Sequence, residues 1–371
     1  MADVAIAGGG IIGLSIAFEL ASRGASVRVY DSAEPARAAS WAAAGMLAPL
    51  TERLADDAMQ ALCEASLRRY PAFASAIANA GGVDPYLSLD GILHTAYDDA
   101  SLERLAARGA VLEAAGHRAT LLDRAETLLA EPALGKHVRG ALLVEGEGQI
   151  DNRRLGRALA AACRARGVRI HTGIEHLRIE CDARRVLGVR SSAGYVPAGA
   201  IVNAAGAWAA QLEGVPQNCV PTVRPVKGQM HAIEIPKGFM RHTIWVPGGY
   251  LVPRRDGRLL VGATVEEAGY DARVTSGGIA SLLRAALDAA PALSAFSVSE
   301  TWAGLRPGTP DERPYVCATP LHGYYLAAGH YRNGILLAPE TATLVAGMVE
   351  GAAAGPPSFT LERFSTKARS A

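Results

Sequence analysis

Three glycines and one acidic residue near the start of the chain have the spacing of a dinucleotide-binding turn. Gly8 permits a tight turn, Gly10 lets a pyrophosphate approach the backbone, and Gly13 lets a helix pack closely against a strand. Asp31 could accept hydrogen bonds from the hydroxyl groups of a ribose. Together these residues predict a site that holds a dinucleotide by its phosphates and its adenosine ribose.

The segments around these residues fit that interpretation. Residues 3–7 and 27–30 are short apolar runs typical of buried parallel strands, and residues 14–23 have the apolar spacing of a helix that ends at Gly24. The free N–H groups of the first helical turn, and the helix dipole, would face the phosphates. In a chain with 40 glycines the glycine pattern alone is weak. With the strand, the helix and the acid in register, a nucleotide site is favoured over a purely structural turn.

The motif by itself does not distinguish FAD from NAD. Ser32 follows Asp31 at a position where NADP-binding enzymes often have arginine, which disfavours a 2′-phosphate. An NAD-dependent dehydrogenase is therefore the alternative to a flavoprotein at this point.

The composition excludes several classes of protein. The 371 residues exceed the usual limit of one hydrophobic core, so we expect two domains. The net charge is +1 and no basic tract occurs, so no nucleic-acid partner is expected. No apolar run is long enough to predict a membrane span, and no signal peptide is recognised, so we expect a cytoplasmic protein. The widely spaced cysteines, without a CxxC pair, argue against a disulfide framework or a metal site; they are Cys63, Cys163, Cys181, Cys219 and Cys317.

The first half of the chain continues the pattern of a parallel sheet covered by helices. We predict helices over residues 57–80 and 154–166, a strand over 168–171, a β-meander over 175–196 and a buried strand over 200–206.

Two parts of the chain depart from this pattern. Residues 86–97 resemble a pair of strands from a different domain, and short strands within residues 226–265 predict an antiparallel sheet, followed by a helix over 276–290. Residues 324–329 return to the character of a parallel strand, and a helix is predicted over 339–350. The first and last segments are therefore expected to share one domain.

At this point several motifs together resemble a known family. The chain is similar to the D-amino acid oxidase superfamily of flavoproteins, and most closely to the glycine oxidases of thiazole (thiamine) biosynthesis. The matching stretches keep the family's order and span nearly the whole chain; they are residues 6–31, 40–49, 202–208, 226–229, 250–253, 260–264, 302–308 and 328–337. The combination is specific, although the glycine motif alone is not.

The resemblance implies an α/β fold of the D-amino acid oxidase type. A Rossmann-like, glutathione-reductase-like FAD-binding domain would be formed by residues 1–85, 148–219 and 307–360. An antiparallel-sheet substrate domain would be formed by residues 86–147 and 220–306, with a tail at 361–371. Family members form tetramers, which implies a homo-oligomer.

The resemblance also implies FAD rather than NAD. The family usually has Glu at the position of Asp31. Backbone groups of Ile174 would face the adenine. The implied cofactor-binding residues are Gly8, Gly10, Ile11, Ile12, Gly13, Asp31 and Ser40, then Ala44, Gly45, Met46 and Leu47 along the isoalloxazine, then Ile174, Ala205 and Gly206, and finally Arg332, Asn333, Gly334, Ile335 and Leu336 near the N1–C2=O end of the flavin.

The cofactor is expected to be noncovalent. In the related sarcosine oxidases a cysteine attaches the FAD, and Gly304 occupies that position here, with Cys317 nearby but displaced.

Three residues are implied to act on the substrate. Arg306 would bind a carboxylate through its planar fork, and Tyr250 could add a further hydrogen bond. Arg332 would face either flavin or substrate, whereas His330 is expected to orient a loop. Gly248–Gly249 replace bulkier residues of some relatives, which predicts a wide pocket mouth.

The implied reaction is the oxidative deamination of glycine or small N-substituted glycines. A hydride would pass from Cα to flavin N5, the imine would hydrolyse to glyoxylate, and oxygen would be reduced to hydrogen peroxide. No catalytic base is obvious in the sequence, and none is required if the amine binds neutral, because the nitrogen lone pair then assists the direct transfer of the hydride. The alternatives are a D-amino acid oxidase, a dehydrogenase with another electron acceptor, or a flavin-bound interaction protein with a degenerate site. The presence of both Arg306 and Tyr250 argues against the last of these.

Overall fold

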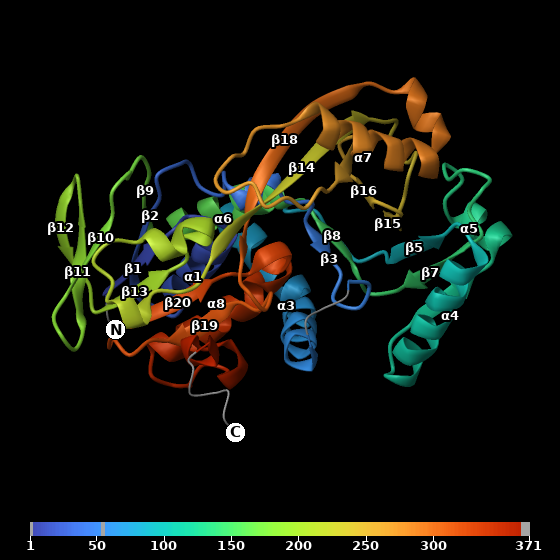
Figure 1. Cartoon of the computed structure of the whole chain (residues 1–371). Helices are drawn as coiled ribbons and strands as arrows, with labels where there is room; N and C mark the ends of the chain where they lie inside the picture. The colour runs from blue at the N-terminus through green and yellow to red at the C-terminus, as the bar shows by residue number, and fades with distance from the viewer. Residues whose placement is uncertain (1–2, 53–55, 365–371) are drawn as a thin grey trace.

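Two large sheets organise the chain in the computed structural model, which describes residues 3–52 and 56–364 (Figure 1). The first has six strands in the order β19-β20-β13-β1-β2-β9. Neighbouring strands are parallel except for β19, which is antiparallel to β20. The strands are β1 (Asp3–Ala7), β2 (Ser26–Tyr30), β9 (Arg169–His171), β13 (Ala200–Asn203), β19 (Tyr315–Ala318) and β20 (Tyr324–Ala328).

The predicted unit of strand, glycine turn, helix and strand is confirmed at the centre of this sheet. Helix α1 (Ile11–Ser22) begins three residues before its predicted start, because Gly10 is already an extended N-cap. Gly8 has φ +106°, and an added Cβ there would overlap the carbonyl oxygen of Ala204. A Cβ at Gly13 would overlap the carbonyl oxygen of Gly8. The turn therefore depends on glycine at both positions.

Four helices form one hydrophobic core with this sheet. They are α1, α3 (Asp57–Gly81), α6 (Asn152–Ala165) and α8 (Gly334–Val349). Among them, α8 begins five residues before the predicted start at residue 339, so that Pro339 lies inside the helix.

Two side chains of α3 allow α8 to continue through Pro339. Proline has no N–H, so the carbonyl of Ile335, four residues earlier, loses its helical partner. The hydroxyl of Tyr70 donates to this carbonyl instead. The hydroxyl of Ser66 donates to the carbonyl of Leu336 at 2.6 Å and accepts from the N–H of Glu340 at 3.2 Å. A prediction from sequence treats proline as a helix start, because the compensating groups come from another helix.

The second sheet has eight strands in the order β18-β14-β17-β16-β15-β5-β7-β6. All neighbours are antiparallel except β15 and β5, which confirms the predicted antiparallel character with one parallel pair. The strands are β5 (Ile92–Ala96), β6 (Ala119–Leu122), β7 (Gly140–Val144), β14 (Arg224–Glu234), β15 (Thr243–Val246), β16 (Gly249–Pro253), β17 (Arg258–Gly262) and β18 (Val298–Gly308). Helix α7 (Ser276–Ala289) packs on β14, β16 and β17 and encloses a second core.

The predicted strand pair within residues 86–97 is wrong. β4 (Leu87–Ser88) pairs with β8 (Gly148–Ile150), which also pairs with β3 (Met46–Leu47), whereas β5 joins the eight-stranded sheet. A short apolar run does not reveal its partner, since pairing is decided by distant segments. The β-meander is confirmed as β10 (Arg178–Cys181), β11 (Val186–Ser191) and β12 (Gly194–Pro197).

The remaining described elements are short or lie at the edges. The helices are α2 (Ala39–Ala42), α4 (Asp99–Ala114) and α5 (Arg124–Ala130), and the 3₁₀ turns are Gly206–Gln211 (η1), Gln217–Cys219 (η2), Pro291–Ala295 (η3), Tyr331–Asn333 (η4), Pro357–Phe359 (η5) and Leu361–Phe364 (η6). Of the predicted tail, residues 365–371 lie outside the described residues, and the exact division into domains stays a prediction. Within the described part of the chain, none of the helices is long and apolar enough to cross a membrane.

Replacing Tyr70 by Phe should destabilise the protein. The change keeps the ring but leaves the buried Ile335 carbonyl without its donor, which costs about 1–3 kcal/mol. Denaturant unfolding measures this loss. The matched control is Tyr195→Phe, because that hydroxyl also donates to a carbonyl, of Leu187, but Tyr195 is 45% exposed and water can replace it. Equal stability of the two variants would contradict the role of Tyr70.

Candidate active site

A cavity of about 750 Å³ is bordered by elements of both large sheets. Its walls include the turn after β1, the end of β2, the segment around α2, the N-terminal end of α8, and parts of β14, β16 and β18. This volume lies in the range of cofactor and ligand pockets. The glycine turn and the predicted substrate residues therefore share one cavity.

Most of the predicted site residues line this cavity. Those that do are Gly8, Gly10, Ile11, Ile12, Asp31, Ser40, Ala44, Gly45, Met46, Ile174, Ala205, Gly206, Tyr250, Arg306, Arg332, Asn333, Gly334 and Ile335. Gly13, Leu47 and Leu336 are buried in the wall behind it. They shape the cavity without bordering it.

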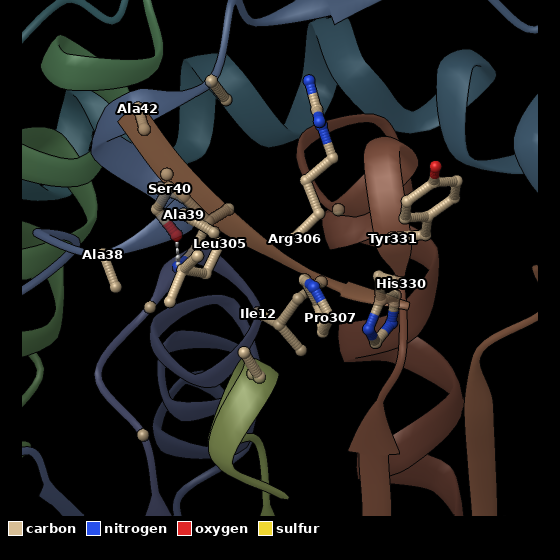
Figure 2. Close-up of a pocket in the computed structure, with 18 of the residues that line it drawn as sticks. Ile12, Ala38, Ala39, Ser40, Ala42, Leu305, Arg306, Pro307, His330 and Tyr331 are labelled. Atoms are coloured by element: carbon tan, nitrogen blue, oxygen red, sulfur yellow. Dashed lines mark hydrogen bonds between the residues drawn. The ribbon is translucent and has the colours of Figure 1, made fainter. Parts of the chain in front are cut away.

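Gly10 leaves an open cradle at the N-terminal end of α1. A Cβ added there would meet only the Oγ of Ser40, at 3.2 Å. The Ser40 hydroxyl accepts a hydrogen bond from the N–H of Ile11 at 2.9 Å, as the dashed line in Figure 2 marks. The cradle thus combines free backbone space, the positive end of a helix and a hydroxyl group, which suits a pyrophosphate.

Asp31 also braces the glycine turn. One carboxylate oxygen accepts from the N–H of Gly9, and the other accepts from the N–H of Ala33 at 2.8 Å. The carbonyl of Asp31 accepts from the N–H of Ile174 at 3.0 Å. The N–H of Ile174 is therefore committed to the fold, and its carbonyl is the backbone group that could face an adenine.

The segment that leads from α2 to β3 is held by side chains from helix α6 and from strand β18. The amide of Asn152 donates to the carbonyls of Ser40 and Trp41 at 2.8 and 2.9 Å, and the indole N–H of Trp302 donates to the carbonyl of Ala42 at 2.9 Å. Arg153 stacks over the ring of Trp41, with 3.7 Å from its Cζ to the ring centroid. These contacts fix the small apolar residues that line one wall.

Arg254 fixes the same segment, although no motif in the sequence points to it. Its Nη2 donates to the carbonyl of Ala44 at 2.7 Å and to the side chain of Asn152 at 2.9 Å. Its Nη1 donates to the carbonyl of Ile150 at 3.1 Å and to Gln149. Burial lowers the pKa of Arg254 to about 10, which still leaves it charged at neutral pH.

Arg306 also lines the cavity. Its side chain extends from β18, between Ala42 and Tyr331 in Figure 2. Nη1 donates to the carbonyls of Lys227 and Thr264 at 3.3 and 3.1 Å. A Cβ at Gly228 on the neighbouring strand would overlap the guanidinium, so glycine makes room for the group. The two carbonyls hold the plane of the fork that would bind a carboxylate.

Tyr250 lines the cavity close to Arg306. Its ring packs edge-on against Trp245, with 5.7 Å between the ring centroids, and a Cβ at Gly262 would collide with it. Burial raises the pKa of the Tyr250 phenol, and the charge of Arg306 together with a hydrogen bond to it acts in the opposite direction. Tyr250 is therefore a neutral hydroxyl beside a guanidinium, as carboxylate recognition requires.

The segment between β20 and α8 supplies two further groups. Arg332 is half-exposed, lies 3.8 Å from the carboxylate of Glu312 and stacks over the ring of Tyr331. His330 is 2% exposed, its Nε2 lies 3.1 Å from the Thr341 hydroxyl, and burial lowers its pKa to about 3. Neutral His330 thus ties the loop to α8, in agreement with its expected role.

Two buried acids near the site have no signal in the sequence. Glu52 lines the cavity, and burial raises its pKa to about 7 although Arg332 and Arg306 act against this. Glu147 accepts from the N–H groups of Leu50 and Thr51, and its pKa is also raised to about 7 by burial. Neither acid belongs to a recognisable motif. The fold places Glu52 at the cavity and buries Glu147 behind it, against the backbone of Leu50 and Thr51.

The cysteines lie away from the cavity. None of the five, all of which are in the described part of the chain, borders it. Cys317 is 2% exposed within β19, and burial raises the pKa of its thiol to about 11. A Cβ at Gly304, which does border the cavity, would overlap the Cβ of Ala42. Within residues 3–52 and 56–364, His, Cys, Asp and Glu side chains form no group of three or more that could hold a metal ion.

Comparison with known proteins gives consistent matches. A family model described as FAD dependent oxidoreductase matches residues 3–348. The bifunctional protein ThiO/ThiG of Synechocystis sp. is 38% identical over 98% of this chain and 54% of its own length. The glycine oxidase of Pseudomonas putida is 36% identical over 94% of this chain and 95% of its own. The chain thus spans about half the length of the bifunctional relative and nearly all of the single-function one.

Solved structures agree with these matches. The glycine oxidase of Geobacillus kaustophilus has a TM-score of 0.90 and 35% identity, with 98% of both chains covered. The iminodiacetate oxidase of Chelativorans sp. has a TM-score of 0.87 and 27% identity, with 96% of this chain and 98% of that chain covered.

Replacing Gly10 by Val should yield a folded protein that does not retain FAD. The added side chain meets little protein but fills the space that a pyrophosphate needs. The ratio of flavin to protein absorbance after purification measures the loss. Gly277→Val is the matched control, because Gly277 also lies at the start of a helix, in open space, away from the cavity. Stoichiometric flavin in the Gly10 variant would contradict the assignment.

Proposed function

Because the chain belongs to the family of FAD-dependent oxidoreductases, which are enzymes, we propose that it catalyses the oxidative deamination of glycine or small N-substituted glycines. The observation that carries the proposal is the shared cavity, which is bordered both by the cradle of Gly10 and by the fork of Arg306 beside Tyr250. The cradle suits a dinucleotide, and the fork suits a small carboxylate.

The residues present suit a noncovalently bound FAD. The N-terminal end of α1 and the cradle at Gly10 suit the pyrophosphate, and Asp31 borders the cavity where a ribose would lie. The N-terminal end of α8, at Gly334 and Ile335, suits the negative charge that a reduced flavin acquires. When bound, FAD accepts a hydride from the substrate and is reoxidised by oxygen to give hydrogen peroxide.

The protein's own contribution is to bind and orient the substrate. Arg306 would hold the carboxylate by two parallel hydrogen bonds, because its plane is already fixed by the carbonyls of Lys227 and Thr264. The neutral hydroxyl of Tyr250 would donate a third bond. With the carboxylate fixed, one Cα–H can be aimed at the cofactor, and this orientation supplies much of the rate. The resulting imine would hydrolyse to glyoxylate and ammonia.

The mouth of the substrate pocket supports small N-substituents. Gly248 and Gly249 both line the cavity without side chains. Gly248 has φ +81°, and a Cβ at Gly249 would lie 2.5 Å from the carbonyl oxygen of Gly262. Side chains are therefore disfavoured at both positions, and the space next to them stays open for a substituent.

The family resemblance supports three further proposals. The relatives include proteins that carry the name ThiO, so we assign this chain to thiamine biosynthesis. We also propose a cytoplasmic enzyme and a homotetrameric assembly.

Replacing Arg306 by Ala should strongly reduce oxidation of glycine while FAD stays bound. Removing one partner of a desolvated charge pair costs about 2–5 kcal/mol, which corresponds to about 30-fold to several-thousand-fold in kcat/KM. Arg306→Lys should recover only part of this, because a point charge does not reproduce the fork. Peroxide release measures the rate. Arg190→Ala, which removes an exposed ion pair with Glu180, is the matched control.

The same assay tests the substrate class. Wild-type protein should prefer glycine, sarcosine or a larger N-alkyl glycine over D-alanine and D-proline. A preference for bulky D-amino acids would make the enzyme a D-amino acid oxidase, and reduction of a dye without peroxide would make it a dehydrogenase. Full activity of Arg306→Ala would remove Arg306 from the site.

Acid precipitation should release all of the flavin into the supernatant. The thiol nearest in sequence to the predicted attachment position, that of Cys317, is buried in another strand and does not border the cavity. The flavin absorbance of the supernatant and of the pellet measures how the flavin divides between them. If the pellet keeps flavin, the Cys317→Ser variant tests whether Cys317 is the point of attachment. Flavin that stays with the wild-type pellet would contradict noncovalent binding.

A further inference from the structure

Glu52 is a buried carboxylate without a protein partner for one of its oxygens. The residue is 8% exposed and borders the cavity. Its Oε2 is buried and has no hydrogen-bond partner among the described residues. Ionised, such a carboxylate is costly to bury unless a cation or a donor reaches it. The arrangement therefore implies that something other than the described part of the chain pairs with Glu52.

The charges around Glu52 differ from those of a structural ion pair. Arg306 and Arg332 are near enough to lower its pKa, yet within residues 3–52 and 56–364 no Lys, Arg or His nitrogen lies within 4 Å of its carboxylate. Arg306 is held by backbone carbonyls, and the ion pair of Arg332 is with Glu312. The cavity thus presents a cationic group, Arg306, that can bind a carboxylate, and an anionic group, Glu52, that is not paired with it.

The backbone that carries Glu52 is held firmly in place. Glu147 is fully buried and accepts hydrogen bonds from the N–H groups of Leu50 and Thr51 and from the Thr51 hydroxyl. The N–H of Glu52 itself donates to the carbonyl of Ala48 at 3.1 Å. These hydrogen bonds fix the backbone that places Glu52 at the cavity.

We propose that Glu52 binds the ammonium group of the substrate and accepts its proton. This inference rests on the proposed function, because it needs an amino-acid zwitterion whose carboxylate is bound by Arg306. The two ends of such a substrate match the two charges of the cavity. Transfer of a hydride from Cα needs a neutral amine, whose lone pair assists the loss, so a group that removes the ammonium proton is required at neutral pH.

The proposed step moves one proton from the ammonium group of the substrate to the carboxylate of Glu52. The N–H bond of the ammonium breaks, its electron pair stays on nitrogen, and an O–H bond forms on Glu52. The substrate becomes a neutral amine with its carboxylate still on Arg306, while Glu52 becomes a neutral acid. The total charge of the site does not change. Glu52 returns its proton to solvent through the cavity mouth after the product leaves.

The pH dependence follows from the sign of the pKa shift. Burial raises the pKa of Glu52 to about 7, so the acid is protonated and cannot accept a proton below that pH. The catalytic efficiency should therefore rise as the pH increases through this region. The titratable and charged groups that act on or with Glu52 are Arg306 from β18, Tyr250 from β16, Arg332 from η4, Glu312 after β18, Cys63 from α3 and Glu147 before β8.

Glu52→Gln provides the test. It should lower kcat/KM for glycine by about 100-fold or more, as expected for the loss of a general base. The pH at which kcat/KM of this variant rises should be higher than in the wild type, closer to the pH at which the free amine loses its own proton. Binding of acetate, followed by the flavin spectrum, should be unchanged or tighter, because acetate has the carboxylate but no ammonium. A purely structural role of Glu52 would weaken acetate binding as well.

Two further variants keep the test decisive. Glu312→Gln is the matched control, since Glu312 is also near Arg332 but is 53% exposed and does not border the cavity; its effect should be small. If Glu52→Gln loses its flavin, Glu52→Asp takes its place in the test. The kcat/KM of Glu52→Asp should still rise with pH, as in the wild type, and should fall less than that of Glu52→Gln. This inference alone would be overturned if the wild type oxidises glycine and the kcat/KM of Glu52→Gln stays within threefold of the wild-type value at every pH. A wild type inactive on glycine would overturn the proposed function and this inference together.

Discussion

The site depends on one buried guanidinium, that of Arg254. It donates to the carbonyls of Ala44 and Ile150 and to the side chains of Gln149 and Asn152, and so joins β16 of the large sheet to the wall segment and to the start of α6. An arginine has five donors in a fixed plane, so few other side chains could satisfy these four acceptors at once. The cofactor wall and the substrate sheet are thereby held in one orientation, which the chemistry requires.

A second constraint is the balance of charge in the cavity. Arg306 and Arg332 favour an anion, whereas Glu52 is an acid whose raised pKa shows the cost of burying its charge. The cations and this acid come from segments far apart in the chain. Their separation within one cavity lets it distinguish the two ends of a zwitterion from a simple carboxylate, and this gives the site both an orientation and a dependence on pH.

The N-terminal end of α8 shows how the fold brings backbone groups to the cavity. At Pro339, the hydroxyls of Tyr70 and Ser66 donate hydrogen bonds to the carbonyls of Ile335 and Leu336 within this helix. The helix begins at Gly334, so that its positive end borders the cavity where Arg332 also lies. A core contact between two helices therefore supports a helix whose end contributes to the electrostatics of the site.

The sequence by itself determined the features that depend on local chemistry. The glycine turn with Asp31, the β-meander and the antiparallel character of the middle of the chain follow from residue spacing, and the motifs around Tyr250 and Arg306 identified the family. Tertiary structure alone decided the rest. The partners of residues 86–97, the early start of α8, the clamp of Arg254 and the presence of Glu52 at the cavity all depend on groups distant in sequence. Burial and long-range pairing, which no local pattern encodes, fix these features.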